Sequence, residues 1–163
     1  MIEFDILLDA TGAVRHGAAM PSWSAFADMA PALAEQVRER LEAHPYKLIA
    51  TLRRDGSPRV SGIELEFRDD GELVTGSMPG SVKARDLERD GRFALHNTPA
   101  PEPEWTGDAK LAGRAEPWAG PRDGAKYFRL ELTEVSTVSL DADRTALIVE
   151  VWTPDGGVRT FTR

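Results

Sequence analysis

Hydrophobic residues follow a helical period in the first third of the chain. Apolar residues at steps of three or four form one stripe, which consists of Phe26, Met29, Leu33, Val37 and Leu41. Such steps are typical of an amphipathic helix. Pro31 lies inside the stripe, and proline is favoured at the first position of a helix. The pattern therefore predicts two consecutive helices, the second starting at Pro31 and ending before His44-Pro45.

From Tyr46 onward the hydrophobic period changes to two, which is typical of half-buried strands. The strands predicted in this way are Tyr46–Arg54, Pro58–Phe67, Glu72–Ser77, Arg92–Asn97, Ala109–Trp118, Tyr127–Leu140, Thr145–Trp152 and Val158–Thr162. A short helix over residues 81–90 interrupts them, with Ser81 as its N-cap and Gly91 at its end. Because hairpin turns join most strands, the pattern predicts a mainly β, antiparallel barrel.

The composition narrows the class of protein. The 163 residues fit a single domain, in which residues 1–21 form an extension of uncertain structure. No apolar run reaches the roughly 18 residues of a membrane helix, and the N-terminus lacks the basic region of a secretory signal. Cysteine is absent, which favours a cytoplasmic protein. A net charge of −7 argues against nucleic acid and requires a local basic cluster for any anionic ligand.

The segment Gly76–Leu87 carries the strongest chemical signal. A strand end, a Gly/Ser turn and a helix start follow one another there, and free N–H groups at a helix N-terminus bind anions. Ser81 adds a hydroxyl group. Lys83 adds a positive charge in the first turn, where it opposes the helix dipole. Two interpretations stay open at this point: a phosphate site, or a solvated lysine after an ordinary cap.

Arg59 is the second candidate ligand for an anion. In the strand Pro58–Phe67, Arg59 and Ser61 alternate with Val60 and so share a face with apolar residues such as Ile63. A polar pair on an apolar face can direct Arg59 toward an anion. The alternative is an arginine at the exposed start of a strand.

Together these segments resemble the pyridoxamine 5'-phosphate oxidase-like family of flavin-binding split barrels, from about Trp23 to Arg163. The resemblance lies in the order of three motifs: the strand pair Leu48–Ser61, the turn Gly80-Ser81-Val82-Lys83-Ala84 and the segment Leu87–Arg92. It implies a six-stranded antiparallel split barrel with an N-terminal helix and a short helix after the third strand. It also implies a homodimer that holds FMN or the deazaflavin coenzyme F-420 in a groove at the dimer interface.

The resemblance assigns cofactor-binding roles to particular residues. Arg59 and the turn Gly80–Lys83 match the family's phosphate contacts, but Val82 replaces an arginine, and Arg85 is the candidate substitute. Glu150-Val151-Trp152 is similar to a family motif whose tryptophan lies near the flavin of the other chain. The expected cofactor-binding residues are Arg59, Val60, Ser61, Thr75, Ser77, Gly80, Ser81, Lys83 and Trp152.

The departures from the family concern the substrate. Glu64 stands where the oxidases carry a lysine for the substrate phosphate, and their C-terminal Arg-x-His pair is missing. Pyridoxamine 5'-phosphate is therefore not the expected substrate. The resemblance implies an oxidoreductase that moves a hydride between FMN or a deazaflavin and a small organic molecule. Two alternatives are a non-enzymatic protein that stores or senses the cofactor, and a structural dimer with an empty groove.

Other candidate sites are weaker. The histidines His16, His44 and His96 are too scattered for a metal site, so no metal is expected. No catalytic side chain is identified, because a flavin carries the hydride itself. The acidic loop Glu102–Trp105 has two interpretations, a lid over the site or a solvated loop.

Overall fold

The protein is described here by a computed structural model that covers residues 20–101 and 104–163. Its helices are α1 (Trp23–Met29), α2 (Pro31–Glu42) and α3 (Val82–Arg89). Its strands are β1 (Lys47–Leu52), β2 (Pro58–Ile63), β3 (Glu66–Phe67), β4 (Leu73–Ser77), β5 (Arg92–His96), β6 (Asp108–Trp118), β7 (Lys126–Leu140), β8 (Leu147–Thr153) and β9 (Gly157–Thr162). The mainly β, antiparallel architecture is as predicted. Most of the N-terminal extension lies outside the described residues.

The two N-terminal helices follow the predicted pattern. Ser22 caps α1 by accepting a hydrogen bond from the Ala25 N–H at 3.3 Å, and α2 begins at Pro31. Four members of the apolar stripe are buried, namely Phe26, Leu33, Val37 and Leu41. Met29 is the exception and is 52% exposed. The backbone leaves the helical conformation at Ala30, so the two helices do not share one continuous face.

All strands belong to one antiparallel sheet with the order β2-β1-β5-β6-β7-β4-β3, and β8 and β9 continue from β7 as a hairpin. The predicted strand Pro58–Phe67 is in fact two strands, because β2 pairs with β1 whereas β3 pairs with β4. The described residues thus hold nine strands, where the resemblance implied six.

The sheet curls without closing its hydrogen-bonded ladder. β2 and β3 end its seven-strand path, β9 ends the branch through β8, and the chain crosses from β2 to β3 through Glu64 and Leu65. The Thr75 hydroxyl on β4 donates a hydrogen bond to the Glu64 carbonyl oxygen at 2.8 Å and holds this crossing in place. The result is a barrel that is split between β2 and β4.

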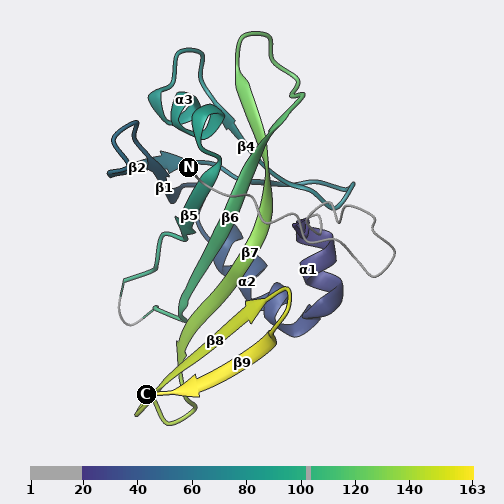
Figure 1. Cartoon of the computed structure of the whole chain (residues 1–163). Coiled ribbons are helices and arrows are strands. Elements are labelled where there is room, and N and C mark those ends of the chain that lie inside the picture. The colour runs from purple at the N-terminus through teal and green to yellow at the C-terminus, as the bar shows by residue number, and fades with distance from the viewer. Residues whose placement is uncertain (1–19, 102–103) are drawn as a thin grey trace, which may run out of the picture.

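The hydrophobic core lies between the sheet and the two N-terminal helices, which pack beside β7 and β8 (Figure 1). α3 packs on β1 and β6 and is hydrogen-bonded to β2, at the opposite end of the molecule from the β8–β9 hairpin (Figure 1). Ile49 of β1 is fully buried, whereas its neighbour Leu48 is exposed on the other face. No helix in the described part of the chain is long and apolar enough to cross a membrane.

Candidate functional site

Arg59 lies where β2 meets α3. Its Nε donates a hydrogen bond to Asp86 Oδ2 at 2.7 Å, and its side chain remains 26% exposed. The predicted alternation holds: Arg59 and Ser61 are partly buried on one face, and Val60 is 67% exposed on the other. The structure therefore brings Arg59 and Ser61 toward α3 and points Val60 away from them.

Lys83 makes a second bridge between the same two elements. Its Nζ donates a hydrogen bond to the Gly62 carbonyl oxygen on β2, at 2.5 Å. Burial lowers the pKa of Lys83, and the nearby negative charge of Glu64 partly opposes that effect. The lysine is thus a partly buried, positioned cation rather than a solvated one.

The turn before α3 has the conformation that the sequence predicts. Gly80 has a φ of +75°, a left-handed value that glycine adopts without strain. The Ser81 Oγ accepts a hydrogen bond from the Ala84 N–H at 3.4 Å and so caps α3. Arg85 Nη2 donates back to the Gly80 carbonyl oxygen at 3.2 Å. Arg85 therefore braces the turn on which the phosphate contacts are expected.

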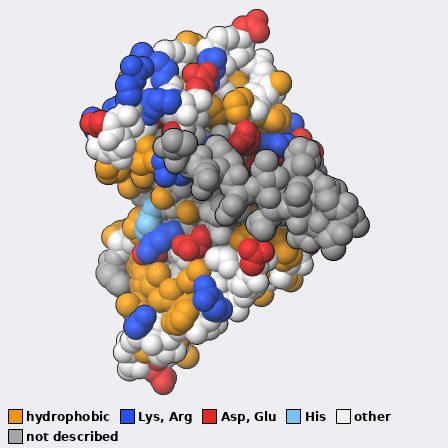
Figure 2. All heavy atoms as spheres, viewed as in Figure 1, with side chains coloured by type: hydrophobic (Ala, Val, Ile, Leu, Met, Phe, Trp, Pro, Cys, Tyr) orange, Lys and Arg blue, Asp and Glu red, His pale blue; other side chains and the backbone are white. Residues whose placement is uncertain are grey.

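Basic side chains gather over α3 and the β1–β2 hairpin (Figure 2). The hairpin and the helix carry the basic residues Arg53, Arg54, Arg59, Lys83, Arg85 and Arg89, against the acidic residues Asp55, Asp86 and Glu88. The chain as a whole carries a net charge of −7. This basic cluster is therefore the local concentration of positive charge that an anionic ligand would require.

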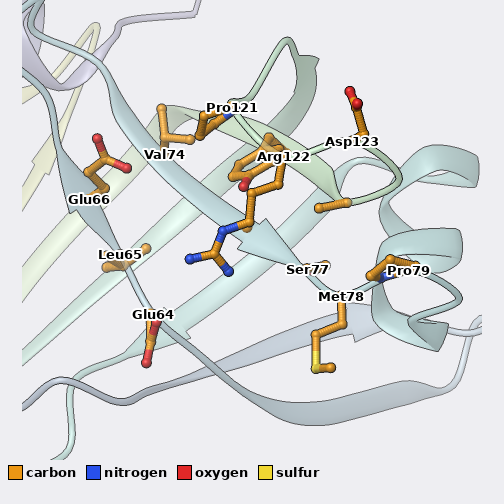
Figure 3. Close-up of a pocket in the computed structure, with 13 residues that line it drawn as sticks. Glu64, Leu65, Glu66, Val74, Ser77, Met78, Pro79, Pro121, Arg122 and Asp123 are labelled. Carbon is orange, nitrogen blue, oxygen red and sulfur yellow. The ribbon is translucent and has the colours of Figure 1, made fainter.

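A pocket of about 490 Å³ opens beside the α3 turn, between the β2–β3 crossing, the end of β4 and the β6–β7 loop (Figure 3). Glu64 and Leu65 line one side, and Ser77 and Met78 line another. The Arg122 side chain extends across the pocket toward Glu64 and Leu65 (Figure 3). The Ser77 hydroxyl is buried and has no hydrogen-bond partner among the described residues.

Two expected site residues lie elsewhere. Trp152 is 1% exposed, and its ring packs on Phe26 with the centroids 4.7 Å apart. A side chain so enclosed in its own chain has almost no surface to offer a flavin on another chain. Thr75 is also buried, and its hydroxyl is already used by the Glu64 carbonyl. The structure thus places Arg59 and Lys83 at the junction of β2 and α3, beside the turn at Gly80 and Ser81, and buries Thr75 and Trp152. Ser61 shares the Arg59 face of β2, Ser77 lines the pocket beside the turn, and Val60 is exposed on the other face. The cofactor-binding role of these expected site residues stays a prediction.

Sequence reasoning missed the buried carboxylate of Asp86. This residue contacts Thr51, Arg59 and Arg89. The sequence carries no signal for this, because Asp86 stands among charged residues, and its burial beside Leu87 on α3 is visible only in the structure. Arg122 was missed as well, and the loop in which it lies carries no motif that marks it.

Among the described residues, no group of three or more His, Asp or Glu side chains is placed so that it could hold a metal ion. His96 Nδ1 lies 2.6 Å from the Asn97 carbonyl oxygen, which indicates a structural role. His16 and part of the acidic loop, Glu102 and Pro103, lie outside the described residues, so the lid interpretation stays a prediction.

Comparison with known proteins supports the fold and the family. PhzG from Burkholderia lata, solved with tetrahydrophenazine-1-carboxylic acid, is 17% identical, with a TM-score of 0.62 over 88% of this chain and 93% of that chain. A pyridoxamine 5'-phosphate oxidase-related, FMN binding protein from Nostoc punctiforme is 10% identical and has a TM-score of 0.60. The match covers 82% of this chain and 95% of that chain. HutZ, the heme storage protein from Vibrio cholerae, is 15% identical and has a TM-score of 0.50. The match covers 61% of this chain and 89% of that chain.

At these identities the solved structures establish a shared fold. No curated protein matches the sequence. The family model described as pyridoxamine 5'-phosphate oxidase matches residues 33–151, which is most of the chain and includes β2, the α3 turn and the pocket. The chain belongs to the pyridoxamine 5'-phosphate oxidase family.

Proposed function

We propose that the protein binds a phosphate-bearing flavin, FMN or the deazaflavin coenzyme F-420, and uses it to transfer a hydride to or from a small organic molecule. The observation that carries this proposal is the pair of bridges between β2 and α3. Arg59 and Lys83 hold their charges at the same junction, next to the capped turn at Ser81. A phosphate placed there meets two cations and the free N–H groups of a helix start.

The pocket beside the turn is the proposed place of the flavin ring and the substrate. Its volume of about 490 Å³ lies within the usual range of small-molecule sites. Ser77 lines it, and its buried hydroxyl has no hydrogen-bond partner among the described residues, so a small shift of the side chain would let it bond to a ligand. When bound, the flavin supplies the hydride chemistry, and the protein contributes binding and orientation.

Storage or sensing of the cofactor is the alternative function, and it uses the same site. The similarity to the Vibrio cholerae heme storage protein supports this alternative, because the same fold there serves storage. Turnover distinguishes the two. An enzyme consumes reduced cofactor when an acceptor is added, whereas a storage protein binds the cofactor and leaves it unchanged.

A homodimer is part of the proposal. Val60, Ala50, Ala94 and Ala112 are successive cross-strand partners on β2, β1, β5 and β6. Together with Leu48 they line an open, largely apolar groove of about 590 Å³. An apolar row across four strands suits a second copy of the chain. We expect sedimentation to show a dimer at micromolar concentration and Val60→Glu to shift it toward monomer; a monomeric wild type would contradict this.

The function is tested on the purified protein without added cofactor. Mass spectrometry of the molecule released on denaturation should identify FMN or a deazaflavin. Titrations with FMN, F-420 and hemin then compare affinities, and a panel of acceptors tests turnover. Tight binding of hemin with no binding of either flavin would contradict the proposal.

A further inference from the structure

Asp86 is a buried acidic residue on α3 that is bonded from three directions. It is 3% exposed. Its Oδ2 accepts hydrogen bonds from Thr51 Oγ1 on β1 at 3.2 Å and from Arg59 Nε on β2 at 2.7 Å. Its Oδ1 accepts one from Arg89 Nη2 on α3 at 3.1 Å. Burial of a carboxylate lowers the stability of the fold unless the carboxylate is paired. The three partners of Asp86 lie on β1, on β2 and one turn further along α3.

The charge on Asp86 is maintained by these partners. Burial by itself raises the pKa of the carboxyl group, but the hydrogen bonds from Arg59, Arg89 and Thr51 outweigh burial and lower the pKa. Arg89 is itself fixed, because it also donates to the Leu52 carbonyl oxygen. Asp86 is therefore an ionised acceptor in a rigid surrounding.

This bond determines how Arg59 is presented. A guanidinium group carries five N–H donors on three nitrogens, and Asp86 occupies the one on Nε. Within the described chain, no other hydrogen bond of Arg59 is found. Its two terminal nitrogens are therefore left for a ligand, at the end of a side chain that is one-quarter exposed. A fixed Nε restricts rotation of the group and reduces the entropy lost when an anion binds.

We propose that Asp86 is a positioning residue that holds the Arg59 guanidinium with its two terminal nitrogens directed outward for an anionic group of the ligand. This inference rests on the proposed function in one respect, the identity of the anion, which is there the phosphate of the flavin. The opposite role would be repulsion, since a carboxylate beside an anion site repels an anionic ligand. The two roles predict opposite effects of removing the charge.

The test begins with the orientation of Arg59 in the ligand-free protein. Hydrogen exchange of the Arg59 Nε–H is measured by NMR in wild type, with the signal assigned by its loss in Arg59→Lys. Asp86→Asn keeps the shape of the side chain but replaces one acceptor oxygen by a donor. We expect the exchange rate to rise at least about tenfold in Asp86→Asn. The matched control is Asp90→Asn, which lies just after the same helix and pairs with Arg92.

The second part measures ligand binding by the same variants. We expect Asp86→Asn to weaken FMN binding about tenfold and riboflavin binding much less, because riboflavin lacks the phosphate. Asp90→Asn should change neither. Unchanged exchange at Arg59, or unchanged or tighter FMN binding in a folded Asp86→Asn, would overturn the positioning role. If Asp86→Asn does not fold, Thr51→Val removes one anchor of Asp86, and a smaller change in the same direction is expected.

Failure of the proposed function gives a different result. If the wild type binds neither FMN nor inorganic phosphate, the proposal of an anion site at Arg59 is wrong. The exchange measurement, which needs no ligand, still decides whether Asp86 orients Arg59.

Discussion

Lys83 on α3 donates a hydrogen bond to the carbonyl oxygen of Gly62 on β2, so that a single lysine joins the helix to the strand that carries Arg59. The lysine keeps two further N–H donors, since an ammonium group has three. A phosphate at the α3 turn can therefore bind Lys83 without breaking its bond to β2.

Replacing Lys83 tests this arrangement. Lys83→Ala removes a charge-assisted hydrogen bond to the phosphate, about 1.5–3 kcal/mol, which corresponds to a roughly 10- to 150-fold loss of FMN affinity. Calorimetric titration measures the loss. A second variant, Arg85→Ala, tests the other cation at this turn, which lies on the same helix and is bonded to the Gly80 carbonyl oxygen. If Arg85→Ala weakens FMN as much as Lys83→Ala, Arg85 does replace the arginine missing at Val82.

Trp152 should matter for stability rather than for the cofactor. Its ring is buried against Phe26, so Trp152→Phe leaves unfilled space in the core. We expect the free energy of unfolding to fall by about 1–3 kcal/mol. Urea denaturation measures this change, and an FMN titration of the folded variant should give an unchanged affinity. A large loss of FMN affinity at unchanged stability would restore the role that the sequence motif implied.

Asp90 should contribute to acid sensitivity. Hydrogen bonds from the side chain and the backbone N–H of Arg92 lower the pKa of Asp90 from 3.8 to about 2. Because the folded pKa lies below the unfolded value, the contribution to stability is present above pH 4 and is lost as the pH falls toward 2. Melting temperatures of wild type and Asp90→Asn should therefore differ at neutral pH and converge near pH 2. A difference that stays constant over this range would contradict the assignment.

Glu64 should exclude a phosphorylated substrate. Glu64 lines the pocket, and a like charge a few ångströms away costs on the order of a kcal/mol or more. We expect the FMN-loaded protein to turn over pyridoxamine 5'-phosphate poorly, and Glu64→Lys to bind it more tightly. Fluorescence titration and an oxidation assay measure the two effects. Efficient oxidation by the wild type would show that Glu64 does not set the substrate class.

Local patterns in the sequence predicted the elements well. The stripe on α1 and α2, the break at Pro31 and the cap at Ser81 depend on short-range geometry, which a sequence displays directly. The division of Pro58–Phe67 into β2 and β3 was not visible. Alternation continues through Glu64 and Leu65, although the strand changes its partner there.

The site could be predicted only in part, for a similar reason. Arg59 and Lys83 follow from motif and spacing, but their partners are set by how β2 packs on α3. Asp86 stands among charged residues in the sequence and resembles a solvated helix position, yet it is buried. Trp152 resembles a family motif, and only the packing of α1 on the sheet encloses it.

The most direct test of the account is the dependence of binding on the phosphate group. FMN and riboflavin share the same ring and differ by the phosphate, so their affinities are compared by titration into wild type and Arg59→Ala. We predict that wild type prefers FMN by at least about tenfold. Arg59→Ala removes a partner of the buried Asp86, so we expect it to melt at a lower temperature but to stay folded, and to lose most of that preference by weakening FMN alone. Equal affinities of the wild type for FMN and riboflavin would contradict a phosphate site between β2 and α3.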